Sequence, residues 1–132
     1  MKKIIFIILF FMFMFSYGQV ISYGETIIYH EFGHPDFTEM YGDTIVRTYF
    51  DGEEILYFIE GKVVRNISIL SGKREARREL KAIQKWNKER NGWYWTGITK
   101  CRIIEKESQY ILDCRKYDRN NPIPEPIKNQ QL

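Results

Sequence analysis

The sequence predicts an α+β fold, in which an antiparallel β-sheet is packed on one side by a single amphipathic helix and is followed by a β-hairpin. Two observations carry this prediction. Glycine recurs every nine to eleven residues from Gly24 to Gly72, between runs of β-branched and aromatic residues, which is typical of strands joined by short turns. The pattern then changes to helical spacing between about residues 73 and 90. A content of 44% hydrophobic residues excludes a disordered or collagen-like chain.

The first residues have the pattern of an export signal. Lys2 and Lys3 precede an apolar run over residues 4–15, and Ser16 and Gly18 are small residues at the positions expected before a cleavage site. We interpret residues 1–18 as a signal peptide, because the run is shorter than the ~20 residues that a membrane-spanning helix needs. A retained anchor is the alternative. The prediction is an exported protein, periplasmic or secreted, with no stable membrane span after cleavage.

Cleavage leaves one domain over residues 19–118 and a nearly neutral chain. The 20 Lys and Arg residues less Lys2 and Lys3 leave 18, against 17 Asp and Glu. The composition therefore gives no reason to expect nucleic acid as a partner. Residues 119–132 contain alternating prolines and are expected to form an extended, disordered tail.

Strands are predicted where β-branched and aromatic residues gather between the glycines, over 26–32, 44–50, 55–59 and 63–70. Asp51-Gly52 and Glu60-Gly61 are turn signals between neighbouring runs, so the segment reads as an antiparallel meander. The helix follows, because Ala76, Leu80, Ile83 and Trp86 recur at helical spacing among charged residues and Asn91-Gly92 supplies a stop.

A hairpin is predicted over residues 93–105 and 109–116. A two-residue turn at Glu107-Ser108 makes the numbers of opposed residues sum to 215, which places Cys101 opposite Cys114 and apolar residues opposite one another. In an oxidising compartment two such thiols usually pair, so we predict a Cys101–Cys114 disulfide.

Charge divides along the chain. Residues 19–70 contain nine acidic and three basic side chains, whereas residues 71–132 contain eight acidic and fifteen basic ones. We expect a basic helix lying across an acidic sheet. The alternative is that the basic helix face meets an anionic surface of the cell envelope; its residues are Lys73, Arg74, Arg77, Arg78, Lys81, Lys85 and Lys88.

One motif has a catalytic pattern. His30, Glu31 and His34 match H-E-x-x-H, in which two histidines one helical turn apart bind zinc and the glutamate activates a zinc-bound water. The chemistry needs a helix, whereas Pro35 disfavours helical angles at His34 and the preceding residues favour a strand. We therefore expect a strand and a plain turn here and no metal or cofactor, with a small zinc-dependent hydrolase as the alternative.

The stretch from Gly52 to Gly92 resembles the C-terminal domain of TonB-type energy transducers. The shared order is a strand, a Gly turn, a strand ending in Ser71-Gly72, a helix ending in Lys85-Trp86, and Asn91-Gly92 leading into a strand. The resemblance implies a non-catalytic domain that recognises a partner by adding its strand to a sheet edge.

The function expected from the sequence is a non-catalytic protein-interaction module of the cell envelope, with an envelope protein or peptide strand as partner. The predicted binding surface is a sheet edge together with Trp93, Tyr94 and Trp95, since a strand of three large aromatic residues presents at least one away from the core. A secreted structural or inhibitory protein is a further alternative.

Overall fold

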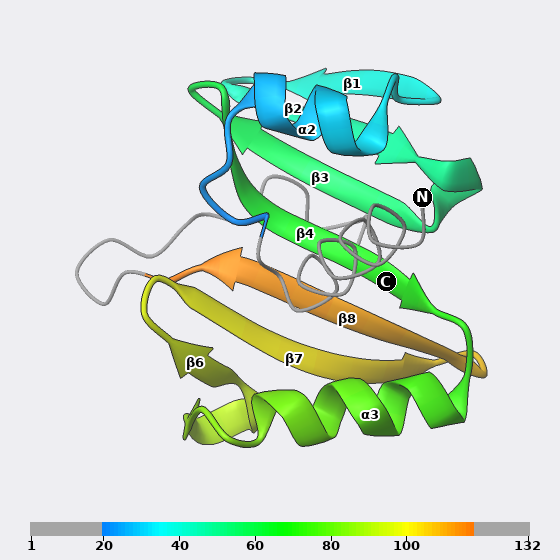
Figure 1. Cartoon of the computed structure of the whole chain (residues 1–132), viewed down its shortest axis with the longest axis vertical. Helices are drawn as coiled ribbons and strands as arrows, with labels where there is room; N and C mark the ends of the chain where they lie inside the picture. The colour runs from blue at the N-terminus through cyan, green and yellow to red at the C-terminus, as the bar shows by residue number, and fades with distance from the viewer. Residues whose placement is uncertain (1–19, 118–132) are drawn as a thin grey trace, which may run out of the picture.

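The fold is α+β, as the sequence predicts: within residues 20–117, eight antiparallel strands form one open sheet and are accompanied by two helices (Figure 1). This computed structural model describes residues 20–117, so the predicted signal peptide 1–18 and tail 119–132 lie outside the described residues. The strand order is β1-β2-β3-β4-β8-β7-β6-β5. No helix within residues 20–117 is long and apolar enough to cross a membrane.

The elements follow one another along the chain with short connections. Their bounds are α2 (Glu25–Phe32), β1 (Phe37–Tyr41), β2 (Thr44–Tyr49), the 3-10 turn η1 (Phe50–Gly52), β3 (Glu54–Ile59), β4 (Lys62–Leu70), α3 (Lys73–Ile83), β5 (Asn87–Lys88), η2 (Arg90–Gly92), β6 (Tyr94–Thr96), β7 (Thr99–Lys106) and β8 (Gln109–Lys116).

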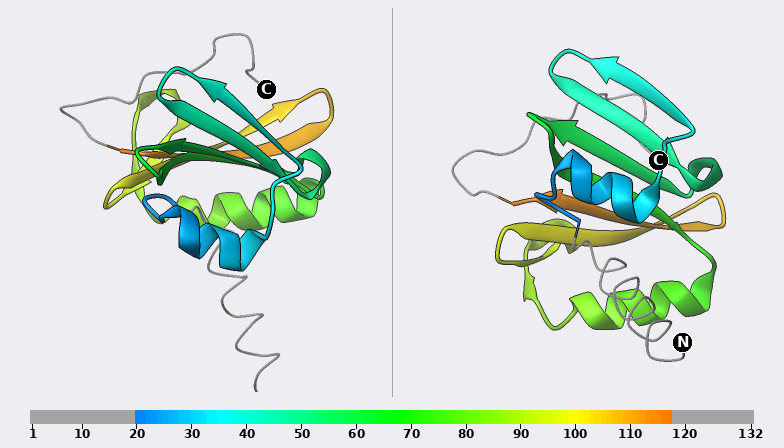
Figure 2. Two further views of the ribbon diagram at one scale, coloured as in Figure 1. Left: turned by 90° about the horizontal axis from the view of Figure 1, so that it is seen from above. Right: turned by 45° about the horizontal axis from the view of Figure 1, so that its top comes forward.

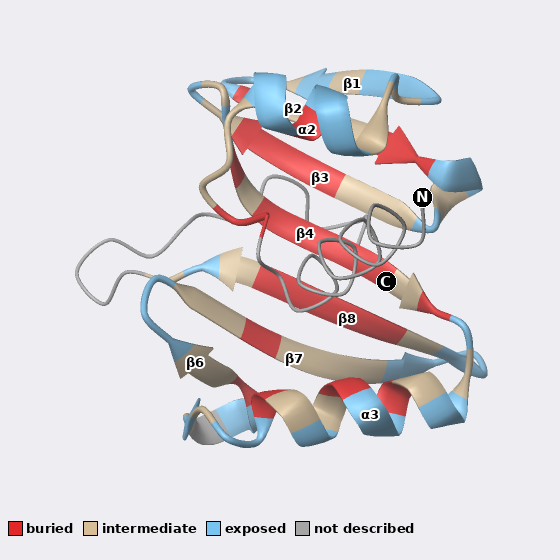
Figure 3. Cartoon of the chain, viewed as in Figure 1, coloured by how far each residue is buried: buried red, intermediate tan, exposed pale blue. Residues whose placement is uncertain are grey.

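Both helices lie on the same side of the sheet (Figure 2, left). The larger hydrophobic cluster fills the space between them and the strands, and it includes Ile28 of α2, Leu56 of β3 and Ile83 of α3. A smaller cluster around Tyr57 and Ile67 lies on the opposite face. The buried residues concentrate in the strands β2, β3, β4 and β8, whereas β1 is largely exposed (Figure 3).

The C-terminal hairpin has the predicted register. Cys101 lies opposite Cys114, and every pair of opposed residues between β7 and β8 sums to 215. The turn residues Glu107 and Ser108 both have positive φ, 50° and 67°, which is the backbone of a type I′ turn. Because this turn matches the twist of the two strands, a two-residue loop fixes the register of the whole hairpin.

Two predicted elements end earlier than expected. The helix predicted over 73–90 stops at Ile83, because Asn87 and Lys88 pair with β6 instead of continuing the helix. The strand predicted over 93–105 is broken into β6 and β7, where positive φ at Gly97 turns the chain back.

Strand β1, over Phe37–Tyr41, was not expected from the sequence, so the sheet has more strands than the predicted meander and hairpin supply.

The acidic and basic halves of the sequence occupy opposite ends of the sheet. Strands β1 to β4 come from the acidic half, while α3 and β5 to β8 come from the basic half, and the sheet is joined only where β4 pairs with β8. The expectation of a basic helix lying across an acidic sheet is therefore wrong. Helix α3 packs against β7, β8 and β4 at the basic end of the molecule (Figure 1).

Candidate functional site

The segment that holds both histidines is helical, so the predicted strand over 26–32 is wrong. Helix α2 runs from Glu25 to Phe32 and buries Ile28 against the core. Packing of this apolar side chain, together with the Phe32 ring against Tyr49 at 5.3 Å, overrides the strand preference of the β-branched residues. The helix ends at Gly33, whose φ of 74° and ψ of −150° are outside the helical region.

The two imidazoles do not form the stacked pair of a zinc site. His30 lies in the last turn of α2, but His34 follows the break at Gly33, so the two residues are not one helical turn apart. His34 instead contacts Tyr29, whose hydroxyl lies 3.3 Å from His34 Nε2. Both histidines and Glu31 are exposed. Within residues 20–117, no group of three or more His, Cys, Asp or Glu side chains is placed to hold a metal ion.

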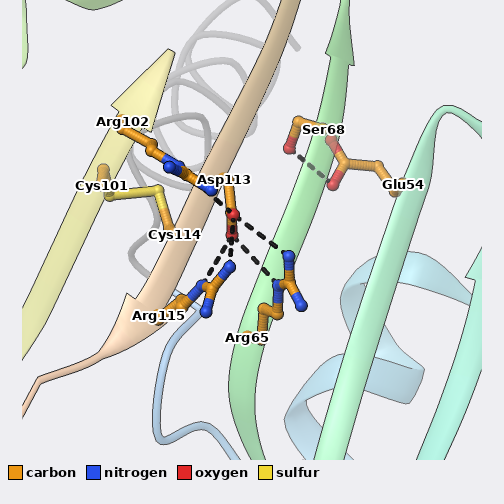
Figure 4. Close-up of a disulfide and its surroundings, with 8 residues drawn as sticks. All are labelled: Glu54, Arg65, Ser68, Cys101, Arg102, Asp113, Cys114 and Arg115. Atoms are coloured by element: carbon orange, nitrogen blue, oxygen red, sulfur yellow. Dashed lines mark hydrogen bonds and ion pairs between the residues drawn. A yellow bond between two sulfur atoms is a disulfide. The ribbon is translucent and has the colours of Figure 1, made fainter. Parts of the chain in front are cut away.

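The predicted disulfide joins Cys101 of β7 to Cys114 of β8 (Figure 4). Both residues belong to the larger hydrophobic cluster and are at most 1% exposed. A disulfide shielded in this way cannot be reached by a thiolate from solvent, which attacks a sulfur atom directly. Its role is therefore to stabilise the hairpin.

The opposite face of the same hairpin carries a buried ionic cluster (Figure 4). The Asp113 carboxylate is fully buried, and it accepts hydrogen bonds from Arg65 at 3.2 and 3.1 Å and from Arg115 at 3.4 and 3.0 Å. Arg102, directly opposite on β7, places its Nε 3.9 Å from the carboxylate. A carboxylate held by two guanidinium groups in this bidentate way stabilises the join between β4 and β8.

The aromatic segment expected to bind a partner lies inside the sheet. Strand β6 is flanked by β7 and β5, so Trp93, Tyr94 and Trp95 are not at an edge. Trp93 is buried beneath three cations, which lie 4.4 to 5.0 Å from its ring centre: Lys100, Arg102 and Arg115.

The next two residues, Tyr94 and Trp95, are half-buried. Tyr94 packs against the helix-side core, and Trp95 stacks on Tyr117 at 5.3 Å. The structure does not test partner binding by these three residues, which stays a prediction.

Glu54 is an acidic side chain in an environment that disfavours its charge. It lies on β3 and accepts a hydrogen bond from the Ser68 hydroxyl at 2.8 Å (Figure 4). Burial raises the pKa of Glu54 from its ordinary value of 4.5 to about 7, and the nearby acidic side chains of Glu53 and Glu75 add to this increase. The Ser68 hydrogen bond acts in the other direction, because it favours the ionised carboxylate.

The two edges of the sheet differ strongly. At one end, β5 is two residues long and carries Lys88, features that discourage pairing with another chain. At the other end, β1 is five residues long, contains neither lysine nor proline, and pairs with β2 alone among the strands of residues 20–117. Its Phe37 and Met40 side chains are 54% and 71% exposed. The sequence signal for β1 is the short run of Phe, Thr, Met and Tyr after Pro35, a segment for which no element was predicted from the sequence.

Other exposed apolar residues gather at the same end of the molecule. Ile27 and Tyr29 of α2 and Phe50 of η1 are each about half exposed. Only Ile98, in the turn between β6 and β7, is comparably exposed elsewhere among the described residues. The unpaired strand and its apolar surroundings make the β1 end the candidate functional site.

Comparison of the chain with protein-family models, with curated proteins and with solved structures found no match.

Proposed function

We propose that this chain is an exported, non-catalytic interaction module of the cell envelope, which captures an extended segment of a partner protein by pairing it with β1. The observation that carries the proposal is the outer edge of β1, with which no strand of residues 20–117 pairs and which has exposed apolar residues at Phe37 and Met40. Main-chain hydrogen bonds supply the affinity in this mode of binding, and the flanking side chains supply the preference for a sequence.

Two further features support the proposal. The resemblance of residues 52–92 to the TonB C-terminal domain implies the same mode of recognition. The buried disulfide and the basic and apolar start of the sequence suit a protein that folds outside the cytosol.

The backbone geometry identifies which groups of β1 face the partner. The two-residue turn between Tyr41 and Thr44 makes these residues a hydrogen-bonded pair. Hydrogen-bonded and non-hydrogen-bonded pairs alternate along an antiparallel ladder, so Thr38 and Met40 point their backbone N–H and C=O groups away from β2. These are the groups that a captured strand would bind.

The test uses peptides selected from a random library for binding to the purified protein. We expect their amide chemical-shift changes to map to β1. Changing Thr38 to Pro removes an outward N–H without disturbing the β1–β2 hydrogen bonds, so it should weaken binding by tenfold or more, corresponding to about 1.4 kcal/mol. The matched control is Thr38→Ala, which alters the exposed side chain but keeps the N–H and should bind within about twofold of the wild type.

Two outcomes contradict the proposal. One is a folded Thr38→Pro variant that binds the selected peptides as tightly as the wild type. The other is a set of shift changes confined to Trp93–Trp95, which would return the binding surface to the aromatic segment.

A further inference from the structure

The outward face of α3 is uniformly cationic. Its five basic residues are exposed and, at 100° per residue, lie within an arc of about 140°: Lys73, Arg74, Arg77, Arg78 and Lys81. The opposite side of the helix faces the core through Ala76 and Ile83. Exposed Lys85 and Lys88 continue the cationic face beyond the end of the helix.

The described residues provide no counter-charge for this face. None of its seven basic side chains forms an ion pair with any residue in 20–117. The two acidic residues of the helix point elsewhere, since Glu75 accepts hydrogen bonds from Ser71 and Glu79 is buried.

Like charges also face one another along the helix. Lys73 and Arg77, Arg74 and Arg78, and Arg77 and Lys81 are each four residues apart, a spacing at which like charges repel. An external anionic surface would relieve this repulsion.

We propose that this face of α3 docks on the surface of an anionic lipid bilayer and binds the phosphates of its headgroups. Clusters of four to eight Lys and Arg residues on one helix face have the charge that such a surface attracts. The face has no apolar side chain to insert, so binding is peripheral and electrostatic.

A lipid surface suits this face better than a single-stranded nucleic acid. Single-stranded nucleic acids are held by aromatic side chains on which bases stack, and the seven residues include none. The apolar run over residues 4–15 would also bring the chain to a membrane during export. This proposal uses a different surface from the β1 edge, so either can fail without the other.

The experiment measures binding of the full chain to vesicles of phosphatidylcholine alone and of phosphatidylcholine with about 30% phosphatidylglycerol. Binding to the vesicles of phosphatidylcholine alone measures any contribution of the apolar N-terminal residues. The additional binding to the vesicles that contain phosphatidylglycerol therefore measures the electrostatic contribution. The double variant Arg77→Gln/Lys81→Gln removes two charges while keeping good helix formers, and it should lower binding to the anionic vesicle about 30-fold.

The matched control, Lys62→Gln/Lys116→Gln, removes two charges from exposed strand positions and should bind within about threefold of the wild type. In the wild type, raising the salt from about 0.05 M to about 0.5 M should abolish the preference for the anionic vesicle. This salt measurement uses only the wild type, so it tests the proposal even if circular dichroism shows that a variant is poorly folded.

Three results would overturn the proposal. They are a wild type without any preference for the anionic vesicle, a preference that survives high salt, and an equal loss in the helix and control variants. A wild type that ignores the vesicles but binds duplex DNA or polyglutamate through Arg77 and Lys81 would assign the face to that polyanion instead.

Discussion

At the scale of single residues, the buried Asp113 carboxylate ties together the two halves of the molecule. It belongs to β8, and its partner Arg65 belongs to β4, so their hydrogen bonds cross the pairing that joins the halves of the sheet. Neither side chain is more than 8% exposed. An ionic pair buried to this extent becomes strongly destabilising when one partner is removed, because the other charge is left without compensation in a poorly solvated position.

We therefore predict that Asp113→Asn lowers the free energy of unfolding by about 3 kcal/mol. Urea denaturation followed by circular dichroism would measure the change. The control is Glu31→Gln, which removes one carboxylate charge from an exposed position and should stay within about 0.5 kcal/mol of the wild type. Equal free energies of unfolding of Asp113→Asn and Glu31→Gln would show that the ionic cluster does not stabilise the pairing of β4 with β8.

The raised pKa of Glu54 predicts that the stability of the folded protein depends on pH. Its pKa is about 7 in the folded state and 4.5 is its ordinary value, so between these pH values the folded protein binds more protons than the unfolded chain. Stability should therefore fall as pH rises from about 4.5 to about 7, and then level off. The loss should be about 2 kcal/mol after allowance for the partial exposure of the side chain.

The variant Glu54→Gln isolates this effect, since it keeps the size of the side chain but cannot ionise. Its stability should lack the decline between about pH 4.5 and 7, and at pH 8 it should exceed that of the wild type. A decline of equal size in the variant would assign the pH dependence to groups other than Glu54.

At the scale of elements, the turns are set by a few backbone angles. Ser108 has φ of 67°, a conformation that L-residues adopt reluctantly and glycine adopts readily. We predict that Ser108→Gly stabilises the protein by about 0.5 kcal/mol, because relief of backbone strain exceeds the added entropy of the unfolded chain. Thermal unfolding would measure the shift.

The control for that substitution is Gln109→Gly, one residue further on. Gln109 is also exposed but lies in β8, so glycine there should destabilise the protein by about 0.5–1 kcal/mol. Loss of stability in both variants would mean that the turn is not strained at Ser108.

The elements predicted most accurately are those specified by both pattern and turn chemistry. The β7–β8 hairpin is one of these, because the two-residue turn leaves only one register that opposes Cys101 to Cys114. Helix α2 was mispredicted for the opposite reason: its β-branched residues favour a strand locally, and only packing of Ile28 on the distant strands decides for a helix. Such long-range contacts are not visible in an eight-residue window.

At the scale of the whole molecule, the sequence predicted the fold class and the disulfide but not the order of the strands. The predicted meander and hairpin did not reveal that β6 lies inside the sheet, because its neighbour β5 is formed by two residues read as the end of a helix. For this reason the β1 edge, and not Trp93–Trp95, is the candidate site in the structure. Edge position depends on every pairing in the sheet, so it could not be inferred from either segment alone.

The separation of acidic and basic halves along the strand order gives the protein a large electric dipole. Residues 20–70 carry nine acidic and three basic side chains, and residues 71–117 carry six acidic and thirteen basic ones, so the negative pole lies towards β1 and the positive pole towards α3. In the field of a negatively charged membrane such a dipole aligns before any contact is made. The molecule would approach with α3 foremost and β1 facing outwards, already oriented to meet another protein.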